Sequence, residues 1–209
     1  NKRQTRADDA SFKASNLSDT GATLAWSGAQ DNVAVTQYQV ISEGEISATT
    51  AETTLELGSL KAWSEFTLTL VAVDGAGNVS APGPSVTFKT TDTEPPTWPE
   101  GAALTTSEVT PSSVTLSWPE ALDNAQVASY QISQNKVVVA TTDAETTTAT
   151  IVGLDPSSTH TFTVWAIDVA GNLNDQGPSA TISTTDAAAP TWPEGANVEP
   201  PKKTAVKKT

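Results

Sequence analysis

The feature that most constrains this sequence is a six-residue segment that occurs twice. The residues Thr-Trp-Pro-Glu-Gly-Ala stand at 97–102 and again at 191–196, so equivalent positions lie 94 residues apart. A fixed period of this length indicates a tandem array, because copies of one structural unit keep their spacing along the chain. The second copy is therefore predicted to open a third unit, of which the sequence contains the residues up to Thr209.

Other segments of the two copies match when they are overlaid. Leu-Ala-Trp at 24–26 corresponds to Leu-Ser-Trp at 116–118, an offset of 92 residues. Ala-Val-Asp-Gly-Ala-Gly-Asn at 72–78 corresponds to Ala-Ile-Asp-Val-Ala-Gly-Asn at 166–172, an offset of 94. The second copy thus has two additional residues within 130–154. Because insertions are tolerated best in loops, a loop or an edge strand is predicted there.

Polar and apolar residues alternate along most of the chain, which is typical of strands. Clear examples are residues 23–26, 114–118, 66–72 and 160–166. Turn-forming pairs that contain glycine or asparagine separate such stretches, and no stretch has the apolar spacing of an amphipathic helix. Short strands with a turn about every 8–12 residues predict an antiparallel β-sandwich for each copy.

Charge and composition exclude several classes of partner. Residues 14–201 contain 22 acidic residues and only three basic ones, Lys61, Lys89 and Lys136. An acidic surface repels nucleic acid, which is therefore not expected as a partner. The sequence has no cysteine, and it has no run of about 20 apolar residues, so neither a disulfide nor membrane insertion is expected. The lysine pairs in 202–208 are interpreted as part of a solvated linker.

Taken together, these motifs resemble the fibronectin type III domain. The resemblance rests on the Leu-x-Trp strands, on Tyr-Gln-Val at 38–40 and Tyr-Gln-Ile at 130–132, and on the Asp-x-Ala-Gly-Asn turns. It implies an all-β fold of two tandem seven-stranded immunoglobulin-like sandwiches, at residues 9–92 and 98–186. The wording Pro-Pro-Thr-Trp-Pro-Glu-Gly is similar to the bacterial form found in secreted and cell-surface proteins. The resemblance specifies the fold and not the function, since this sandwich hosts many unrelated roles.

The remaining residues are interpreted as connections. Residues 1–8 form an N-terminal linker in this interpretation, residues 93–97 a proline-rich linker, and residues 187–209 a linker with the start of a truncated third unit. Pro95 and Pro96 restrict the backbone, so the joint between the two domains is expected to be short and semi-rigid.

The resemblance also assigns core positions. It places Trp26 and Trp118 between the sheets, and it usually has a tyrosine whose hydroxyl hydrogen-bonds back across the corner before the sixth strand. Here that position holds Phe66 in the first copy and His160 in the second. Because Phe66 has no polar group and His160 retains a ring nitrogen, the first domain is expected to be less stable by about 1 kcal/mol.

Residues for catalysis are missing from the sequence. His160 is the sole histidine, and its position at the corner indicates a structural role, so no histidine is assigned to a Ser-His-Asp triad. With no cysteine and no second histidine, Cys-His and multi-histidine metal constellations are excluded. Paired carboxyl groups can hydrolyse glycosides, but they need a deep cleft, which a small convex sandwich does not offer. The fragment is therefore predicted not to be an enzyme, and no cofactor is assigned to it apart from the alternative of Ca²⁺ that follows.

The loops at the domain ends give two hypotheses about the junction. In the family topology, Asp123 and Asp168 lie at the end of the second domain that faces the first. Carboxylate oxygens suit Ca²⁺, so these residues are candidate metal ligands; the alternative is that each aspartate caps its own turn. Trp63 and Trp98 are the candidate hinge anchors, packing at the joint beside Pro95.

Trp165 is the main candidate for a ligand contact, because the alternation from His160 and Phe162 directs its side chain outward. The alternative is that neighbouring long side chains cover this ring, so that it only fills space at the surface. Exposed aromatic rings stack on sugars and anchor protein contacts. The predicted function is a non-catalytic extracellular or cell-surface spacer, whose partners are the neighbouring domains of the same polypeptide. The alternative is a carbohydrate- or protein-binding adhesion module that uses Trp165 and Tyr130.

Overall fold

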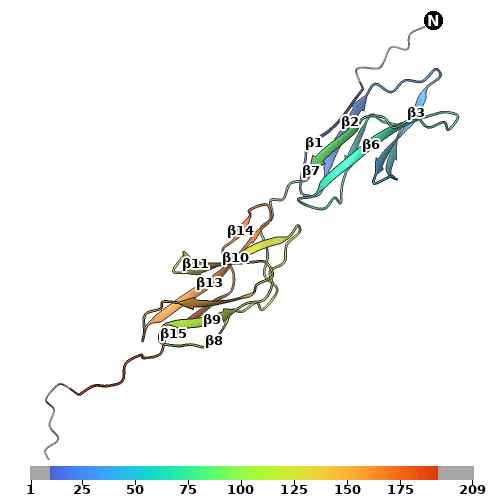
Figure 1. The fold of residues 1–209 in the computed structure, drawn as a ribbon. Coiled ribbons are helices and arrows are strands. Elements are labelled where there is room, and N and C mark those ends of the chain that lie inside the picture. The colour runs from blue at the N-terminus through green and yellow to red at the C-terminus, as the bar shows by residue number, and fades with distance from the viewer. Residues whose placement is uncertain (1–9, 193–209) are drawn as a thin grey trace, which may run out of the picture.

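The computed structural model describes residues 10–192, and these contain fifteen β-strands and no helix. The strands form two separate sandwiches that lie end to end, joined by a short connection (Figure 1). The N-terminal linker interpreted at residues 1–8, most of the third unit and the terminal lysine pairs lie outside the described residues. The described part of the chain includes no helix long and apolar enough to cross a membrane.

The first sandwich packs a three-stranded sheet against a four-stranded sheet. The order of the small sheet is β1-β2-β5 and that of the large sheet is β4-β3-β6-β7, with all pairs antiparallel. This is the seven-stranded arrangement that the sequence predicts. Its strands are β1 (Ser11–Ser15), β2 (Ala22–Ser27), β3 (Val35–Ser42), β4 (Glu45–Thr50), β5 (Thr54–Leu57), β6 (Glu65–Asp74) and β7 (Ser85–Lys89).

The second sandwich repeats this plan and adds one short strand. Its small sheet has the order β12-β9-β8, while its large sheet has the order β11-β10-β13-β14, with β15 also paired to β13. The two-residue β14 replaces a single bridge, Val73 to Val79, in the first sandwich. Its strands are β8 (Thr105–Ser107), β9 (Ser113–Ser117), β10 (Val127–Gln134), β11 (Val137–Asp143), β12 (Thr148–Val152), β13 (Thr159–Asp168), β14 (Leu173–Asn174) and β15 (Ser179–Ser183).

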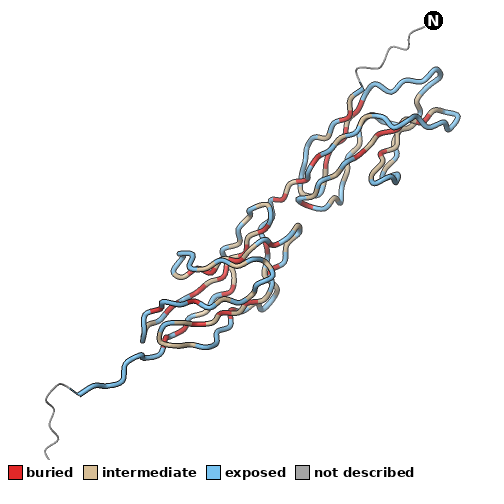
Figure 2. Tube along the Cα trace, viewed as in Figure 1, coloured by how far each residue is buried: buried red, intermediate tan, exposed pale blue. Residues whose placement is uncertain are grey.

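Each sandwich has its own core, built from the inward residues of the alternating strands. Figure 2 shows buried segments running along the inside of both sandwiches. Trp26 and Trp118 are each only 5% exposed and lie in the two core clusters, as the sequence predicts. Because the two clusters share no residue, each domain carries its own hydrophobic stabilisation.

Two local predictions about the second domain are confirmed. The extra residues lie at the turn between β11 and β12, where β11 is the edge strand of its sheet. His160 is buried, and its Nε2 atom lies 3.3 Å from the Asp155 carbonyl oxygen at the predicted corner. Its Nδ1 atom lies 2.9 Å from Gln134 Nε2, so a ring that donates from Nε2 and accepts at Nδ1 satisfies both contacts. Phe66 instead stacks on Phe88.

Candidate functional site: the interdomain junction

The connection between the domains is hydrogen-bonded to the first domain through Asp19. One Asp19 carboxylate oxygen accepts a 2.6 Å hydrogen bond from the Thr91 hydroxyl. The other accepts hydrogen bonds from the Thr93 hydroxyl (2.8 Å) and the Thr93 backbone N–H (3.1 Å). These donors, first Thr91 and then Thr93, lower the pKa of Asp19. A carboxylate with two threonine partners therefore fixes both sides of residue 92.

The same connection is also bonded to the second domain. Asn172 Nδ2 donates to the Asp92 carbonyl oxygen (3.1 Å), and Asn174 Nδ2 donates to the Pro96 carbonyl oxygen (2.7 Å). Thr97 and Leu122 exchange two backbone hydrogen bonds of 2.7 and 2.8 Å. Both asparagines stand at or beside β14, so the additional strand of the second domain positions the groups that hold the linker.

The structure gives the predicted hinge residues separate roles. Pro96 is fully buried, whereas Pro95 is exposed. Trp98 packs on the core of the second domain, with its ring centroid 5.9 Å from that of Tyr130.

The aromatic contacts of the described residues include none between Trp63 and Trp98, and the hinge role of Trp63 stays a prediction. Trp63 has a backbone φ of 50°, and its ring lies beneath the Lys89 ammonium, 3.3 Å from the centroid, within the first domain. This local contact leaves the Trp63 side chain 37% exposed.

The backbone at Gly177 closely approaches the Trp98 ring. A Cβ atom added to Gly177 would overlap the Val164 carbonyl oxygen and lie 2.8–2.9 Å from atoms of the Trp98 ring. No side chain fits in that space. The glycine is therefore needed for the segment between β14 and β15 to close over the tryptophan of the repeated Thr-Trp-Pro-Glu-Gly-Ala segment.

Three aspartates meet where the linker enters the second domain. Asp92 directly precedes the linker, Asp123 lies in the loop between β9 and β10, and Asp168 lies at the end of β13. One carboxylate oxygen of each lies within 4.8 Å of the others. The structure therefore brings the two predicted metal-ligand candidates together and adds a third that the sequence reasoning assigned only as the last residue of the first domain.

Backbone amides fix the orientation of these carboxylates. Asp168 Oδ1 accepts three hydrogen bonds of 2.7–2.9 Å from the N–H groups of residues 170–172. Asp123 Oδ1 accepts two, of 2.9 and 2.8 Å, from Ala125 and Gln126. Each aspartate thus caps its own turn with Oδ1, as the alternative hypothesis states; Asp168 Oδ2 accepts one further hydrogen bond from the Asn172 side chain, and Asp123 Oδ2 has no partner.

The cluster is short of hydrogen-bond donors. Asp92 is only 7% exposed and Asp168 only 2%. The Oδ2 atoms of Asp92 and Asp123 are buried and have no hydrogen-bond partner. Burial raises the pKa of the Asp123 carboxyl, and the neighbouring charges of Asp92 and Asp168 raise it further. A lone buried carboxylate oxygen is costly, so these atoms require an explanation.

The equivalent residues of the first domain lack this crowding. Asp31 and Asp74 cap the same two turns, through hydrogen bonds to the amides of residues 33–34 and of residues 76 and 78. Asp31 is exposed, and the Asn78 side chain and amides lower the pKa of Asp74. In the described residues these two aspartates belong to no group of three acids. The third carboxylate therefore distinguishes the junction from an ordinary pair of capped turns.

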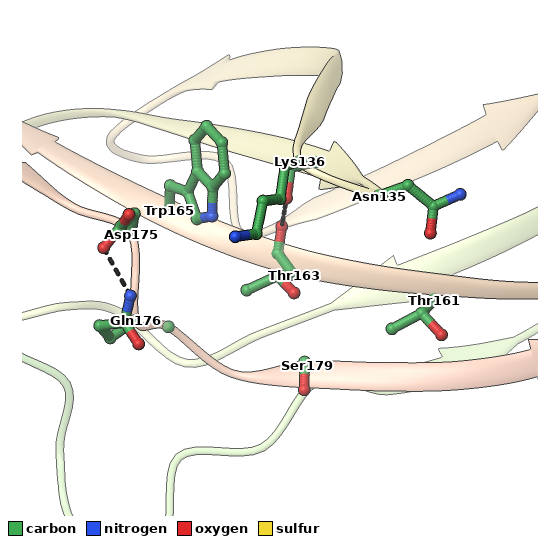
Figure 3. Close-up of a pocket in the computed structure, with 10 residues that line it drawn as sticks. Asn135, Lys136, Thr161, Thr163, Trp165, Asp175, Gln176 and Ser179 are labelled. Carbon is green, nitrogen blue, oxygen red and sulfur yellow. Dashed lines mark hydrogen bonds between the residues drawn. The ribbon is translucent and has the colours of Figure 1, made fainter.

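The predicted ligand-binding aromatics have different environments. Tyr130 is 1% exposed, and its hydroxyl accepts a hydrogen bond from the Ala121 N–H, so the prediction that it contacts a ligand is wrong: the ring belongs to the core. Trp165 lies on the outer face of β13, partly exposed. It lines a groove of about 520 Å³ whose other walls are mainly polar, and Figure 3 shows the Trp165 ring standing over β13. The groove includes Asn135, Lys136, Thr161, Thr163, Asp175, Gln176 and Ser179.

Asp92 could have been found from the repeat. Thr-Thr-Asp at 90–92 recurs as Thr-Thr-Asp at 184–186, and both precede a Pro-Thr-Trp-Pro-Glu-Gly segment. Asp19 and Asn174 carried no comparable signal, because their hydrogen bonds join residues more than 70 positions apart in the sequence.

Comparison with known proteins supports the assignment from the fold. The sequence profile described as "Fibronectin type III domain" matches residues 10–89 and 94–185. The chain belongs to the fibronectin type III family. This family match covers both sandwiches, so neither of them is an unrelated β-fold.

Similar proteins include two bacterial enzymes. "Chitinase A1" of Niallia circulans is 40% identical over 167 residues, which is 78% of this chain and 23% of that protein. "Exoglucanase B" of Cellulomonas fimi is 36% identical over 193 residues, 86% of this chain and 17% of that protein. The chain thus spans about a fifth of the length of these relatives. Among solved structures, a two-domain fibronectin type III segment of chicken tenascin is 21% identical, with a TM-score of 0.42, and covers 84% of this chain and 100% of that one.

Proposed function

We propose that this pair of domains is a non-catalytic spacer in a larger extracellular glycosidase, where it holds the neighbouring domains apart at a defined angle. The observation that carries the proposal is the connection at residues 91–93, where consecutive residues are hydrogen-bonded to opposite domains. Thr91 and Thr93 bind Asp19 of the first domain, while the carbonyl of Asp92 accepts from Asn172 of the second. A flexible connection would not need these contacts.

The relatives supply the context of the proposal. The two bacterial proteins described above bear the names of a chitinase and an exoglucanase, and each is more than four times as long as the segment that matches. An enzyme that acts on an insoluble polymer works outside the cell, so we assign the chain to that location. In this role its partners are the other domains of its own polypeptide, and the reaction itself belongs to one of them.

Small-angle scattering of the 209-residue chain tests the spacer. We expect the profile of an extended rod with a narrow range of interdomain angles. The double variant Asp19→Ala, Asn174→Ala removes one linker contact on each side, so it should keep both domains folded but broaden the distance distribution. A compact particle from the parent chain, or a variant whose distribution is unchanged, would contradict the proposal.

A second candidate function is binding of polysaccharide through the groove beside Trp165. The observation that favours it is the composition of the groove: one aromatic ring with several hydroxyl, amide and charged side chains around it (Figure 3). Aromatic faces stack on the apolar faces of sugar rings, and polar groups at the edge bind their hydroxyls.

Sedimentation with insoluble chitin and with cellulose tests this candidate. If the groove binds, Trp165→Ala should lose most of the bound fraction. Trp63→Ala is the matched control, because it removes a solvent-accessible tryptophan from the other domain, away from the groove. Equal retention of all three proteins, or retention of none, argues against the groove. Neither result bears on the spacer, which the scattering experiment tests separately.

A further inference from the structure

We infer that Asp92, Asp123 and Asp168 form a Ca²⁺ site that locks the linker onto the second domain. The inference goes beyond the spacer proposal and does not depend on it, since it concerns only the ligand of one cluster. It starts from the two buried oxygens, Oδ2 of Asp92 and Oδ2 of Asp123, that have no hydrogen-bond partner. Asp92 is more than nine-tenths buried, and its carboxylate belongs to the group of three.

The donor set selects the class of ligand. Three carboxylates provide only oxygen atoms, which suit hard cations such as Ca²⁺ and Mg²⁺ rather than zinc or copper. Oxygens on opposite sides of Ca²⁺, each at about 2.4 Å, lie about 4.8 Å apart, whereas Mg²⁺ requires a smaller octahedron. The three oxygens lie within 4.8 Å of one another, the greatest separation that two ligands of one Ca²⁺ have. Water molecules would complete its six to eight ligands.

The ligands are already oriented before any ion binds. The N–H groups that cap the Asp123 and Asp168 turns bind Oδ1 of each residue and hold its carboxylate in place. Asp168 Oδ2 accepts a single hydrogen bond, from the Asn172 amide, and retains a lone pair. Asn172 also donates to the Asp92 carbonyl, so the same side chain aligns two of the three ligands. A site prepared in this way loses little entropy on binding.

Charge supports the same conclusion. Every hydrogen-bond donor recorded on the three carboxylates is a backbone N–H or the Asn172 amide, and no lysine among the described residues contributes one. Three acids at this separation repel one another in a medium of low dielectric constant. Either a proton shared between carboxyl groups or a bound cation relieves the repulsion. The cation agrees better with two orphaned oxygens, since a shared proton would draw them into a hydrogen bond.

The position of Asp92 gives the ion a mechanical consequence. Its neighbours Thr91 and Thr93 are bound to Asp19 of the first domain. An ion that holds the Asp92 side chain against the second domain therefore restrains the whole joint. Binding of Ca²⁺ is expected to narrow the range of interdomain angles as well as to stabilise the second domain.

Isothermal calorimetry and thermal melting of the 209-residue chain test the site. About 10 mM CaCl₂ is roughly 10 to 100 times the Kd of extracellular calcium modules, so the site should be close to saturated. We expect a stoichiometry of one Ca²⁺ per chain. The melting temperature of the second domain should be higher in CaCl₂ than in EDTA by an amount on the order of 10 °C. Equal amounts of MgCl₂ at matched ionic strength should give a much smaller rise.

The variants locate the ion. Asp92→Asn should weaken Ca²⁺ binding on the order of tenfold or more, because it removes one of three charged ligands. Asp31→Asn and Asp74→Asn are matched controls: they change the equivalent capped turns of the first domain and should bind Ca²⁺ as the parent does. Binding that survives in Asp92→Asn, or that is lost in the controls, places the ion elsewhere and overturns the inference.

A crossover in stability separates a metal ligand from a merely structural residue. In EDTA, Asp92→Asn should melt no lower than the parent, since the substitution relieves repulsion among three neighbouring acids. This result would also show that the variant folds. In CaCl₂ it should melt well below the parent. An absence of heat and of any change in melting temperature for the parent, or equal effects of CaCl₂ and MgCl₂, would overturn the inference.

Discussion

Substitution of Gly177 by alanine should destabilise the second domain by closing the space above Trp98. The added Cβ would overlap the Val164 carbonyl oxygen and lie 2.8 Å from Trp98 Nε1. Relief requires the segment before β15 to move outward, which breaks the hydrogen bond from Val164 N–H to the Pro178 carbonyl (3.0 Å). That bond is worth about 1 kcal/mol, and overpacking against a fixed ring costs about 1–3 kcal/mol more.

A total of about 3 kcal/mol corresponds to a fall of roughly 12–24 °C in the melting temperature of a domain this size. Differential scanning calorimetry of the full chain should show the loss in one transition only, because the two cores are separate. Gly58→Ala is the matched control: nothing lies within 4 Å of its added Cβ, so it should gain about 0.4–1 kcal/mol or stay neutral. If Gly177→Ala melts like the parent, the argued close approach over Trp98 does not exist in solution.

Three further predictions follow from single contacts. His160→Phe removes the contacts to Asp155 and Gln134 and should lower the unfolding free energy of the second domain by about 1–2 kcal/mol in urea melts; no change would contradict the hydrogen-bonded corner. Tyr130→Phe leaves the Ala121 N–H without its partner and should lower the unfolding free energy by about 1–3 kcal/mol in the same assay. Tyr38→Phe is the control: the described residues show no hydrogen-bond partner for the Tyr38 hydroxyl, so the loss should be less than about 0.5 kcal/mol. Because the pKa of Asp19 is lowered in the fold, the stability that it contributes is present above its ordinary value of 3.8 and is lost as pH falls through the lowered value. The melting temperature of the parent should therefore fall more between pH 5 and pH 2 than that of Asp19→Asn, and parallel curves would contradict the link.

The sequence predicts the fold well because strand alternation and turn chemistry are local. The two core tryptophans and the corner role of His160 follow from their positions in the repeat, and the structure confirms them. The contact of Trp63 with Lys89 could not be predicted, because it depends on the left-handed backbone conformation at residue 63. The predicted ligand contact of Tyr130 fails because β10 directs this side chain into the core.

The junction was harder to predict than the sandwiches. Loop position indicated that Asp123 and Asp168 lie at the same end of the second domain, and the structure places them together. The meeting of Asp92 with these two residues depends on the angle at which one domain follows the other, which no periodicity within a single repeat contains. The repeated Thr-Thr-Asp sequence is the one feature that marks Asp92. It indicates a site only when the residues between the domains are considered together with the loops of the second domain.

The alternation of linker residues between the two domains has a consequence for recombination and for engineering. A cut at residue 97 separates Asp92 from the two aspartates that it meets and the Pro96 carbonyl from Asn174, whereas Asp19 keeps its two threonines. A second domain transplanted without the residues before it would therefore lack Asp92 and the contacts that this residue makes with Asp123 and Asp168. A segment that is exchanged with its joint intact must therefore include Asp92, at the end of the preceding domain, and the loops of Asp123 and Asp168 that it meets.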